Sequence, residues 1–397
     1  METLQPKLRF PEFKENWEKV KLKDVSKYFN GGSFENDVKE DGKYELITLK
    51  SVDMNGNLAH SKRYLDVEIP TLKKNTLIMI LSEQSPGLLG MTAMIPIDNK
   101  YVLNQRVAEI RPNNEVHSYF LSLTINRSQQ YFSKLGAGTK VQNISKPNVE
   151  NFEFLYPSVP EQTRIANFLS AIDEKLHLLK EKKALLEEYK KGMMQKIFNQ
   201  DIRFKDDNGD DFEDWEEKSL QELCDYKNGG SFEKHVCEDG IYNLISLNSI
   251  DINGKIKQKH KKVSITDNSL QKGDLIMVLS DVAHGNFLGL TDIVPGDNFV
   301  LNQRMGALKP KENFSRFYLK TYINFNQSYF KLMGQGSSQQ NLSKGDIESF
   351  VIKLPCLQEQ TKIAQFLSAI DDKISLVGNQ IEETVEYKKG LLQGMFV

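Results

Sequence analysis

Cysteine is scarce in this chain, and long apolar runs are absent. The three cysteines, Cys224, Cys237 and Cys356, are an odd number without CxxC spacing, which excludes a disulfide framework and a four-cysteine zinc site. No run of about 18 apolar residues is present, and the N-terminal segment carries charge where a signal peptide needs apolar residues. We therefore expect a cytoplasmic protein that does not enter a membrane.

The motifs of several enzyme classes are missing as well. No Pro-Pro pair occurs, so the chain has no Asn-Pro-Pro-Tyr loop of the kind that adenine amino-methyltransferases need, and it has no GxxxxGK[ST] phosphate loop. The two short Gly-x-Gly stretches, 136–138 and 334–336, lack the third glycine of a dinucleotide fingerprint. The six histidines form no HxxxH pair. We expect neither a catalytic site, nor a metal site, nor a cofactor in this chain.

The charge is nearly balanced. The 397 residues include 54 acidic and 52 Lys and Arg side chains, a formal net charge of −2. A chain of this length is expected to form two or more domains. Any surface that attracts a polyanion must therefore be local rather than a property of the whole chain.

One internal repeat organises the sequence. Four segments recur, each 198 residues later: 30–35 at 228–233, 103–106 at 301–304, 168–173 at 366–371, and 189–192 at 387–390. This period is far longer than that of a solenoid repeat, which is typically 20–50 residues. The sequence therefore contains a duplicated domain together with its C-terminal tail.

The pattern changes once within each copy. Short β-rich runs alternate with turn-rich segments up to about Tyr156 and Leu354, which predicts mixed α/β domains at 1–157 and 200–355. Apolar residues then recur every seven positions, from Ile165 to Met193 and from Ile363 to Leu391, which predicts long helices within 158–199 and 356–397. Ser158 and Glu161 have the spacing of a capping box at the start of the first helix.

The two apolar stripes have the same period and length, so pairing with each other is the simplest way to bury them. We expect an antiparallel coiled coil with an internal pseudo-two-fold relation between two similar α/β domains. Such a rod would set the distance between the domains. A parallel pair, or two amphipathic helices packed on separate domains, are the alternatives.

Two windows, 116–149 and 313–345, contain no acidic residue and are rich in amides. Arg, Asn and Gln match the hydrogen-bonding edges of guanine and adenine, and Lys and turn amides suit phosphates, so DNA is the expected polyanion. A third basic stretch, 255–262, opposite Lys62 and Arg63 of the first copy, fits either phosphate contact or a solvated face. The candidate DNA-binding residues are Gln84, Ser85, Asn104, Gln105, Arg106, Arg127, Lys140, Gln142 and Asn143 in the first copy, and His284, Asn286, Asn302, Gln303, Arg304, Lys331, Ser337, Gln339, Gln340 and Asn341 in the second.

The candidates fall into two groups. Asn104–Arg106 and Asn302–Arg304 are shared by both copies, so a purely structural role in a turn is the alternative for them. The loops 83–87 and 281–285 stand at equivalent positions of the repeat but differ in sequence. They are the better candidates for specific readout.

The segments 158–173 and 356–371, with their Glu-Gln-x-x-Ile and Phe-Leu-Ser-Ala-Ile-Asp motifs, resemble the specificity subunit of bacterial and archaeal type I restriction-modification systems. The resemblance covers essentially the whole chain and includes the segments 142–145 and 340–343. Cys356 and Gln358 depart from Ser158 and Pro160 of the first copy, which leaves the second helix cap in doubt.

The resemblance implies two target recognition domains, each reading one half of a split, asymmetric DNA site, with the helices setting the spacer. It implies two modification subunits that carry S-adenosylmethionine for adenine methylation, and two motor-nuclease restriction subunits that use ATP and Mg²⁺. It also implies that the helices dock the modification subunits. The chain itself would be non-catalytic. A bivalent DNA- or protein-binding scaffold unrelated to restriction, and a self-contained DNA-modifying enzyme, are the alternatives.

Overall fold

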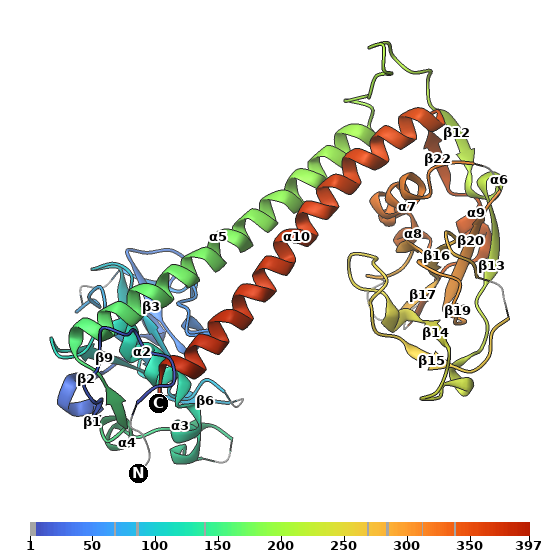
Figure 1. Cartoon of the computed structure of the whole chain (residues 1–397). Coiled ribbons are helices and arrows are strands. Elements are labelled where there is room, and N and C mark those ends of the chain that lie inside the picture. Colours follow the sequence, from blue (N-terminus) through green and yellow to red (C-terminus); the bar gives the residue numbers. More distant parts are fainter. Residues whose placement is uncertain are drawn as a thin grey trace. The chain divides into compact units, whose positions relative to one another are not determined.

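The computed structural model describes residues 5–66, 69–84, 87–138, 140–267, 270–282, 286–311, 313–336 and 339–397. The chain divides into two units (Figure 1). The first unit comprises Met1–Lys180 and Asn379–Val397, and the second comprises Glu181–Gly378. Each unit therefore contains one α/β domain and part of each long helix.

The domain of the first unit contains β1 (Glu18–Lys21), α1 (Leu22–Val25), β2 (Ser26–Asn30), η1 (Glu35–Asp37), β3 (Tyr44–Ile47), η2 (Leu49–Ser51), β4 (Tyr64–Leu65), β5 (Leu77–Ile80), β6 (Ser82–Glu83), β7 (Thr92–Met94), β8 (Tyr101–Leu103), β9 (Val107–Pro112), α2 (Ser118–Arg127), α3 (Gln129–Leu135), β10 (Gln142–Asn143), α4 (Lys146–Glu150) and β11 (Glu153–Tyr156). The long helix α5 (Val159–Phe198) follows.

The second domain repeats this order with β12 (Glu216–Ser219), α6 (Leu220–Leu223), β13 (Cys224–Asn228), η3 (Glu233–His235), β14 (Tyr242–Ile245), η4 (Leu247–Ser249), β15 (Lys261–Val263), β16 (Leu275–Val278), β17 (Ser280–Val282), β18 (Thr291–Ile293), β19 (Phe299–Leu301), β20 (Met305–Pro310), α7 (Arg316–Phe325), α8 (Gln327–Met333), β21 (Gln339–Asn341), α9 (Lys344–Glu348) and β22 (Val351–Leu354). The long helix α10 (Leu357–Met395) ends the described secondary structure.

The sheets of the two domains have the same topology. In the first domain, β2-β9-β5-β7 form a four-stranded antiparallel sheet, and β4-β3-β8 form a mixed three-stranded sheet. Two short antiparallel pairs, β1-β11 and β6-β10, complete it. The second domain repeats these sheets as β13-β20-β16-β18, β15-β14-β19, β12-β22 and β17-β21. The predicted mixed α/β class and the domain duplication are confirmed.

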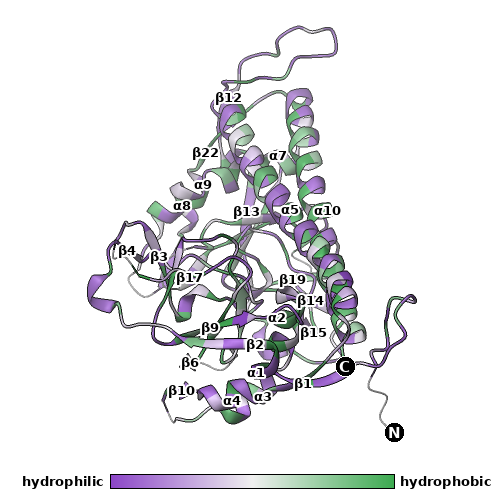
Figure 2. Cartoon of the chain, turned by 90° about the vertical axis from the view of Figure 1, so that its left-hand side faces the viewer, coloured by the Kyte–Doolittle hydropathy of each residue, from purple (hydrophilic) through white to green (hydrophobic). Residues whose placement is uncertain are grey.

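The long helices are continuous, at 40 and 39 residues, or roughly 60 Å each at about 1.5 Å per residue. Their surfaces alternate between hydrophobic and hydrophilic residues (Figure 2). The prediction of α-helices in 158–199 and 356–397 is therefore confirmed. The expected domain limits remain predictions, because the two units divide the helices at 180 and 378.

Within each unit the two helices run antiparallel. In the first unit, Ile165 near the start of α5 shares a core with Leu391 and Met395 at the end of α10. In the second unit, Ile197 at the end of α5 shares a core with Ile363 near the start of α10. The predicted antiparallel pairing is confirmed in each unit taken by itself.

Ion pairs between the repeated motifs accompany this pairing. Lys388 of α10 binds Asp173 of α5 in the first unit. In the second unit, Lys190 Nζ of α5 lies 2.7 Å from Asp371 Oδ1 of α10. Each pair joins the Phe-Leu-Ser-Ala-Ile-Asp motif of one helix to the Tyr-Lys-Lys-Gly motif of the other, so an antiparallel neighbour explains why both motifs recur.

The stripe buried between the long helices does not include every apolar residue beside it. Val385 of α10 is exposed. A two-helix seam covers only about two positions in every seven, so an apolar residue beside the seam stays in solvent.

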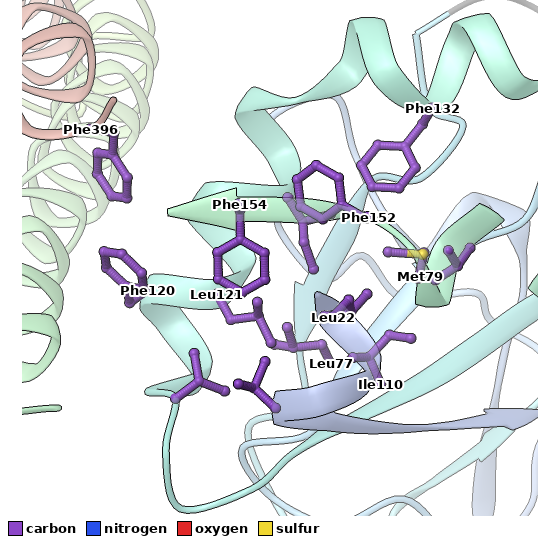
Figure 3. Packing of buried hydrophobic residues seen from close by; sticks show 14 of the residues in the cluster. Leu22, Leu77, Met79, Ile110, Phe120, Leu121, Phe132, Phe152, Phe154 and Phe396 are labelled. Carbon is purple, nitrogen blue, oxygen red and sulfur yellow. The ribbon is translucent and has the colours of Figure 1, made fainter. Parts of the chain in front are cut away.

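The end of each long helix completes the core of a domain. Phe396, just after α10, stacks on Phe120 of α2 in the first unit, with 5.3 Å between ring centroids (Figure 3). Phe198, the last residue of α5, packs edge-on against Tyr322 of α7 in the second unit at 5.1 Å. Within each unit, a domain and the C-terminal end of a long helix therefore share one hydrophobic core.

A buried carboxylate joins each domain to the start of its long helix. Glu161 of α5 accepts hydrogen bonds from Arg9 Nε and Nη2, both at 2.7 Å, and from Trp17 Nε1 at 3.4 Å. We expected Glu161 to close a capping box with Ser158. Both of its oxygens are instead used by Arg9, a residue far away in the sequence, so that interpretation was wrong.

The same joint is present in the second unit. Glu359 of α10 accepts from Arg203 Nη2 at 2.8 Å and from Trp215 Nε1 at 2.9 Å. The change at Cys356 and Gln358 therefore leaves the joint intact. The neighbouring glutamine is also fixed, because Gln162 accepts from the His117 amide at 2.8 Å and Gln360 from the Ser315 amide at 2.9 Å.

Glu161→Gln is expected to lower the free energy of unfolding of the first unit by about 3–5 kcal/mol, because it leaves the largely buried Arg9 guanidinium without its anion. Urea unfolding of the full chain measures this effect. Glu174→Gln removes the same charge from an exposed position of α5, and it should leave the unfolding midpoint unchanged. Equal midpoints for the two variants would contradict the role assigned to Glu161.

Candidate nucleic-acid interface

A short antiparallel strand pair brings two groups of candidate residues together in each domain. In the first unit, β6 pairs with β10 so that Glu83 faces Gln142 and Ser82 faces Asn143. In the second unit, β17 pairs with β21, and Asp281 faces Gln340. The loops expected to differ in readout therefore begin beside the amide-rich segments.

The turn that contains Gln105 and Arg106, or Gln303 and Arg304 in the second unit, is called the Gln-Arg turn. It lies against the base of the same strand pair. The Arg106 carbonyl accepts from the Leu81 amide at 3.1 Å, and the Leu81 carbonyl accepts from the Ile144 amide at 3.0 Å. In the second unit, the Arg304 carbonyl accepts from the Leu279 amide at 3.0 Å, and Arg304 Nη2 donates to Gln339 Oε1 at 3.3 Å. We call these three segments the recognition edge: β6, β10 and 104–106 in the first unit, and β17, β21 and 302–304 in the second.

Most candidate side chains at and beside the recognition edge face solvent. Those exposed are Gln84, Gln105, Arg106, Lys140 and Asn143 in the first unit, and Asn286, Gln303, Arg304 and Asn341 in the second. Gln142, Gln339 and Gln340 are half-buried. Long polar side chains that project from short, hydrogen-bonded strands can reach into a DNA groove while their backbone stays fixed.

The two shared asparagines are buried instead. Asn104 is 5% exposed and Asn302 is 6% exposed. Asn104 Nδ2 donates to Glu35 Oε1 at 2.8 Å, and its Oδ1 accepts from the Gln105 amide at 2.9 Å. These contacts favour the structural role in a turn over contact with bases.

The repeated Asn-Gly-Gly motif, at 30–32 and 228–230, packs against this turn. A Cβ atom on Gly31 would lie 1.9 Å from the Asn104 carbonyl oxygen, and one on Gly229 would lie 2.1 Å from that of Asn302. Only glycine allows so close an approach. The repeated glycines therefore support the turn that presents Gln105 and Arg106.

Arg127 lies in different surroundings. Its guanidinium carbon is 4.8 Å from the centroid of the Phe396 ring, and it lines a cavity of about 220 Å³ together with Trp17 and Phe154. No recognition-edge residue lines this cavity. The structure thus places Arg127 beside the end of α10 rather than with the other candidates.

Lys331 is half-buried on α8, whose first residue, Gln327, donates to the Asn286 carbonyl at 2.8 Å. That helix therefore contacts the end of the second readout loop. Ser85, His284 and Ser337 lie outside the described residues.

Two buried carboxylates at the start of the readout loops were not singled out from the sequence. Glu83 Oε2 accepts from the Leu88 and Leu89 amides at 2.7 and 2.8 Å. Asp281 Oδ2 accepts from the Phe287 amide at 2.8 Å. An acid at matching positions of two loops that differ at the next three positions was the available signal. These contacts fix the far end of each loop to its first residue.

Beside the first recognition edge, Glu35 binds Arg63, and its carboxylate also accepts from Asn104. The hydrogen bonds from Arg63 and Asn104 lower the pKa of Glu35 below its ordinary value, so this group is an anion at neutral pH. Among the described residues, no cluster of three potential metal ligands is present. No described helix combines the length and apolar character needed to cross a bilayer.

The family model for the type I restriction modification DNA specificity domain matches this chain twice, over residues 14–188 and 212–387. Each match covers one α/β domain and most of the long helix that follows it. The chain belongs to this family.

Two relatives from Methanocaldococcus jannaschii match over nearly their whole length. The type I restriction enzyme MjaVIII specificity subunit is 25% identical, covering 97% of this chain and 92% of the relative. The putative MjaX specificity subunit is 24% identical, covering 97% and 94%.

The fold also matches the crystal structure of the type I restriction-modification S subunit from M. genitalium. The TM-score is 0.66 at 18% identity, and the match covers 99% of both chains. The full-length match supports the same succession of domains and long helices.

Asn104→Ala is expected to lower the free energy of unfolding of the first unit by about 1–3 kcal/mol, because it removes buried hydrogen bonds to Glu35 and to the Gln105 amide. Urea unfolding measures the change. Gln105→Ala, at the exposed neighbour, should change the free energy by less than about 0.5 kcal/mol. If Asn104→Ala weakened DNA binding but left stability intact, the turn role would be excluded.

Proposed function

We propose that this chain is the sequence-specific DNA-recognition subunit of a type I restriction-modification complex. Each α/β domain reads one half of a bipartite target through the strand pair of its recognition edge and the adjoining loop. The observation that carries this proposal is that the same three-segment edge occurs twice, with an identical Asn-Gln-Arg segment but different side chains on and beside its strand pair. Val141 and Gln84 of the first unit correspond to Gln339 and Val282 of the second. Different side chains at equivalent backbone positions predict that the two domains read different half-sites. The whole target is therefore expected to be asymmetric.

The chemistry of the recognition edge supports DNA as the ligand. Gln, Asn and Arg side chains form paired hydrogen bonds with adenine and guanine edges in the major groove. Arg106, Lys140 and Arg304 are exposed cations in a chain that has nearly balanced charge overall. The protein thus concentrates its DNA-binding chemistry on local surfaces.

In this proposal, the antiparallel helices set the distance between the two domains, and we call them the ruler. They hold the two domains in inverted orientation on the same side of the DNA, with half-sites separated by about one helical turn. The bases between the half-sites are spanned without being read.

Partner subunits perform the chemistry. Two modification subunits bind S-adenosylmethionine and methylate adenine, and two restriction subunits use ATP and Mg²⁺ for translocation and cleavage. This chain provides neither catalytic residues nor a cofactor site, and the complex works on DNA in the cytoplasm. The family match, the names of the relatives and the absence of methyltransferase and nucleotide-binding motifs from the sequence support this assignment.

Salt-dependent DNA binding distinguishes this function from a bivalent scaffold that binds proteins. The purified chain with its modification subunits should bind duplex DNA with log K falling linearly against log salt, by about 0.9 for each phosphate neutralised. Methylome sequencing of cells with and without the chain should then show one asymmetric, interrupted motif.

Binding without salt dependence, together with an unchanged methylome, would contradict DNA recognition. Methyl transfer by the purified chain alone with S-adenosylmethionine would instead identify it as an enzyme.

We further propose that each unit docks one modification subunit through an exposed Leu-Tyr pair on its helices. Leu178 of α5 and Tyr387 of α10 are more than half exposed in the first unit, as are Leu376 and Tyr189 in the second. The pairs are equivalent under the 198-residue repeat. Two equivalent apolar sites fit two copies of one partner, since exposed Leu and Tyr side chains are typical of binding surfaces.

The double variant Leu178→Ser with Tyr387→Ser should weaken binding of one modification subunit at least tenfold and leave the second bound. Native mass spectrometry of the mixed complex counts the bound copies. Ile97→Ser removes an exposed apolar residue from the domain of the first unit, and it should keep both copies. A variant complex with both partners bound at wild-type affinity would exclude these docking sites.

A further inference from the structure

A cationic cavity lies beside the Gln-Arg turn of the first unit. It has a volume of about 400 Å³, and its lining includes Lys50, Arg63, Arg106 and Glu35. Arg63 is paired with Glu35. Among the residues that the structure describes, no carboxylate lies within ion-pair distance of Lys50 or Arg106. The cavity therefore has two positive charges in excess.

Buried contacts hold this cluster in place. Glu35, which orients Arg63, is itself bound by Nδ2 of the buried Asn104 at 2.8 Å. Arg106 follows two residues after Asn104, and its carbonyl is fixed by the Leu81 amide at 3.1 Å. The charged groups thus extend from an ordered frame, which lowers the entropic cost of binding an anion.

The second unit has the same set of contacts around Glu233, but one of its positive charges stands at a different position. Lys261 Nζ lies 3.0 Å from Glu233 Oε2, and Asn302 Nδ2 lies 3.2 Å from Glu233 Oε1. Arg304 takes the place of Arg106. Two further positions of the cavity lining have changed in charge: Lys50 corresponds to Asn248, and Ser61 corresponds to Lys259. One cation is lost and another is gained. Lys257, which corresponds to Ala59, adds an ammonium group 2.9 Å from the Asn248 carbonyl oxygen, so the second unit also keeps positive charge here.

The retained charge indicates the kind of ligand. A base edge is recognised by donors and acceptors at fixed places, and moving a cation from one position to another would destroy that match. A phosphate needs positive charge close by and tolerates its redistribution. No aromatic side chain lines the first cavity, whereas a flipped-out nucleobase is typically stacked on one.

We propose that each domain binds one backbone phosphodiester of the DNA in this cluster, the phosphate clamp, formed by Lys50, Arg63 and Arg106 in the first unit and by Lys259, Lys261 and Arg304 in the second. The inference rests on the proposed DNA-recognition function and assigns backbone binding and base reading to different residues. Arg106 and Arg304, with the cations around them, hold the DNA backbone, while the loops and strands that differ between the copies read the bases.

The test compares salt dependence with sequence specificity in the full chain bound to its modification subunits. The double variant Arg106→Gln with Arg304→Gln should lower the slope of log K against log salt by about 0.9 per domain, and the methylated motif should stay the same. Lys175→Gln, an exposed charge on α5, should leave the slope unchanged. Thermal unfolding checks that the variants are folded.

A neutral methylphosphonate, placed at one phosphate at a time, locates the contact. The wild type should lose affinity at one position beside each half-site, and the double variant should lose nothing further there. A changed base preference with an unchanged slope would overturn the clamp in favour of base contact. An unchanged slope and motif would overturn it as well.

Replacing chloride by inorganic phosphate at constant ionic strength separates the two possible sources of phosphate. DNA binding should not respond to this change. If phosphate competed with DNA in the wild type but not in the double variant, the cavity would be a site for the free anion. A wild type that binds DNA without salt dependence would refute the proposed function itself, rather than the clamp alone.

Discussion

A buried carboxylate at the first turn of each long helix is the contact on which the rest of the molecule depends. Glu161 and Glu359 each bind an arginine and a tryptophan that precede the first strand of their domain. A charge in such surroundings is tolerated only with its partner in place. Each helix therefore starts at a fixed position on its domain. The helix pairing, the aromatic residue at each helix end and the proposed distance between half-sites all depend on this joint.

The duplication separates what both domains need from what distinguishes them. The joint, the Asn-Gly-Gly turn and the Asp–Lys pairs between the helices recur in both units because both require the same support. The loops that begin at Glu83 and Asp281 share their anchoring carboxylate and a final glycine but differ at the three positions between them. In our proposal, this arrangement lets one half-site change without altering the frame, because the differing side chains lie outside the buried contacts.

Long, periodic features could be predicted from the sequence, whereas contacts between distant segments could not. The seven-residue spacing beginning at Ile165 predicted α5 closely, and the repeated motifs predicted the duplication. The two-residue strands β6 and β10 have no detectable period, so their pairing stayed hidden. The partner of Glu161 was missed because Arg9 lies 152 residues away, and the local spacing with Ser158 indicated a cap. Arg127 was grouped with the amides by composition alone, although its ring contact with Phe396 depends on a helix from the end of the chain.

The ruler is the central claim, and the length of the spacer tests it most directly. Deleting residues 184–187 and 382–385 together removes about one helical turn, or roughly 6 Å, from both helices. Methylome sequencing should then show the same two half-sites with a spacer shorter by about one to two base pairs, at about 3.4 Å per base pair. Residue 184 is already alanine, and substituting alanine at the other seven positions should keep the original spacer. An unchanged spacer in the deletion variant, with methylation retained, would contradict the account.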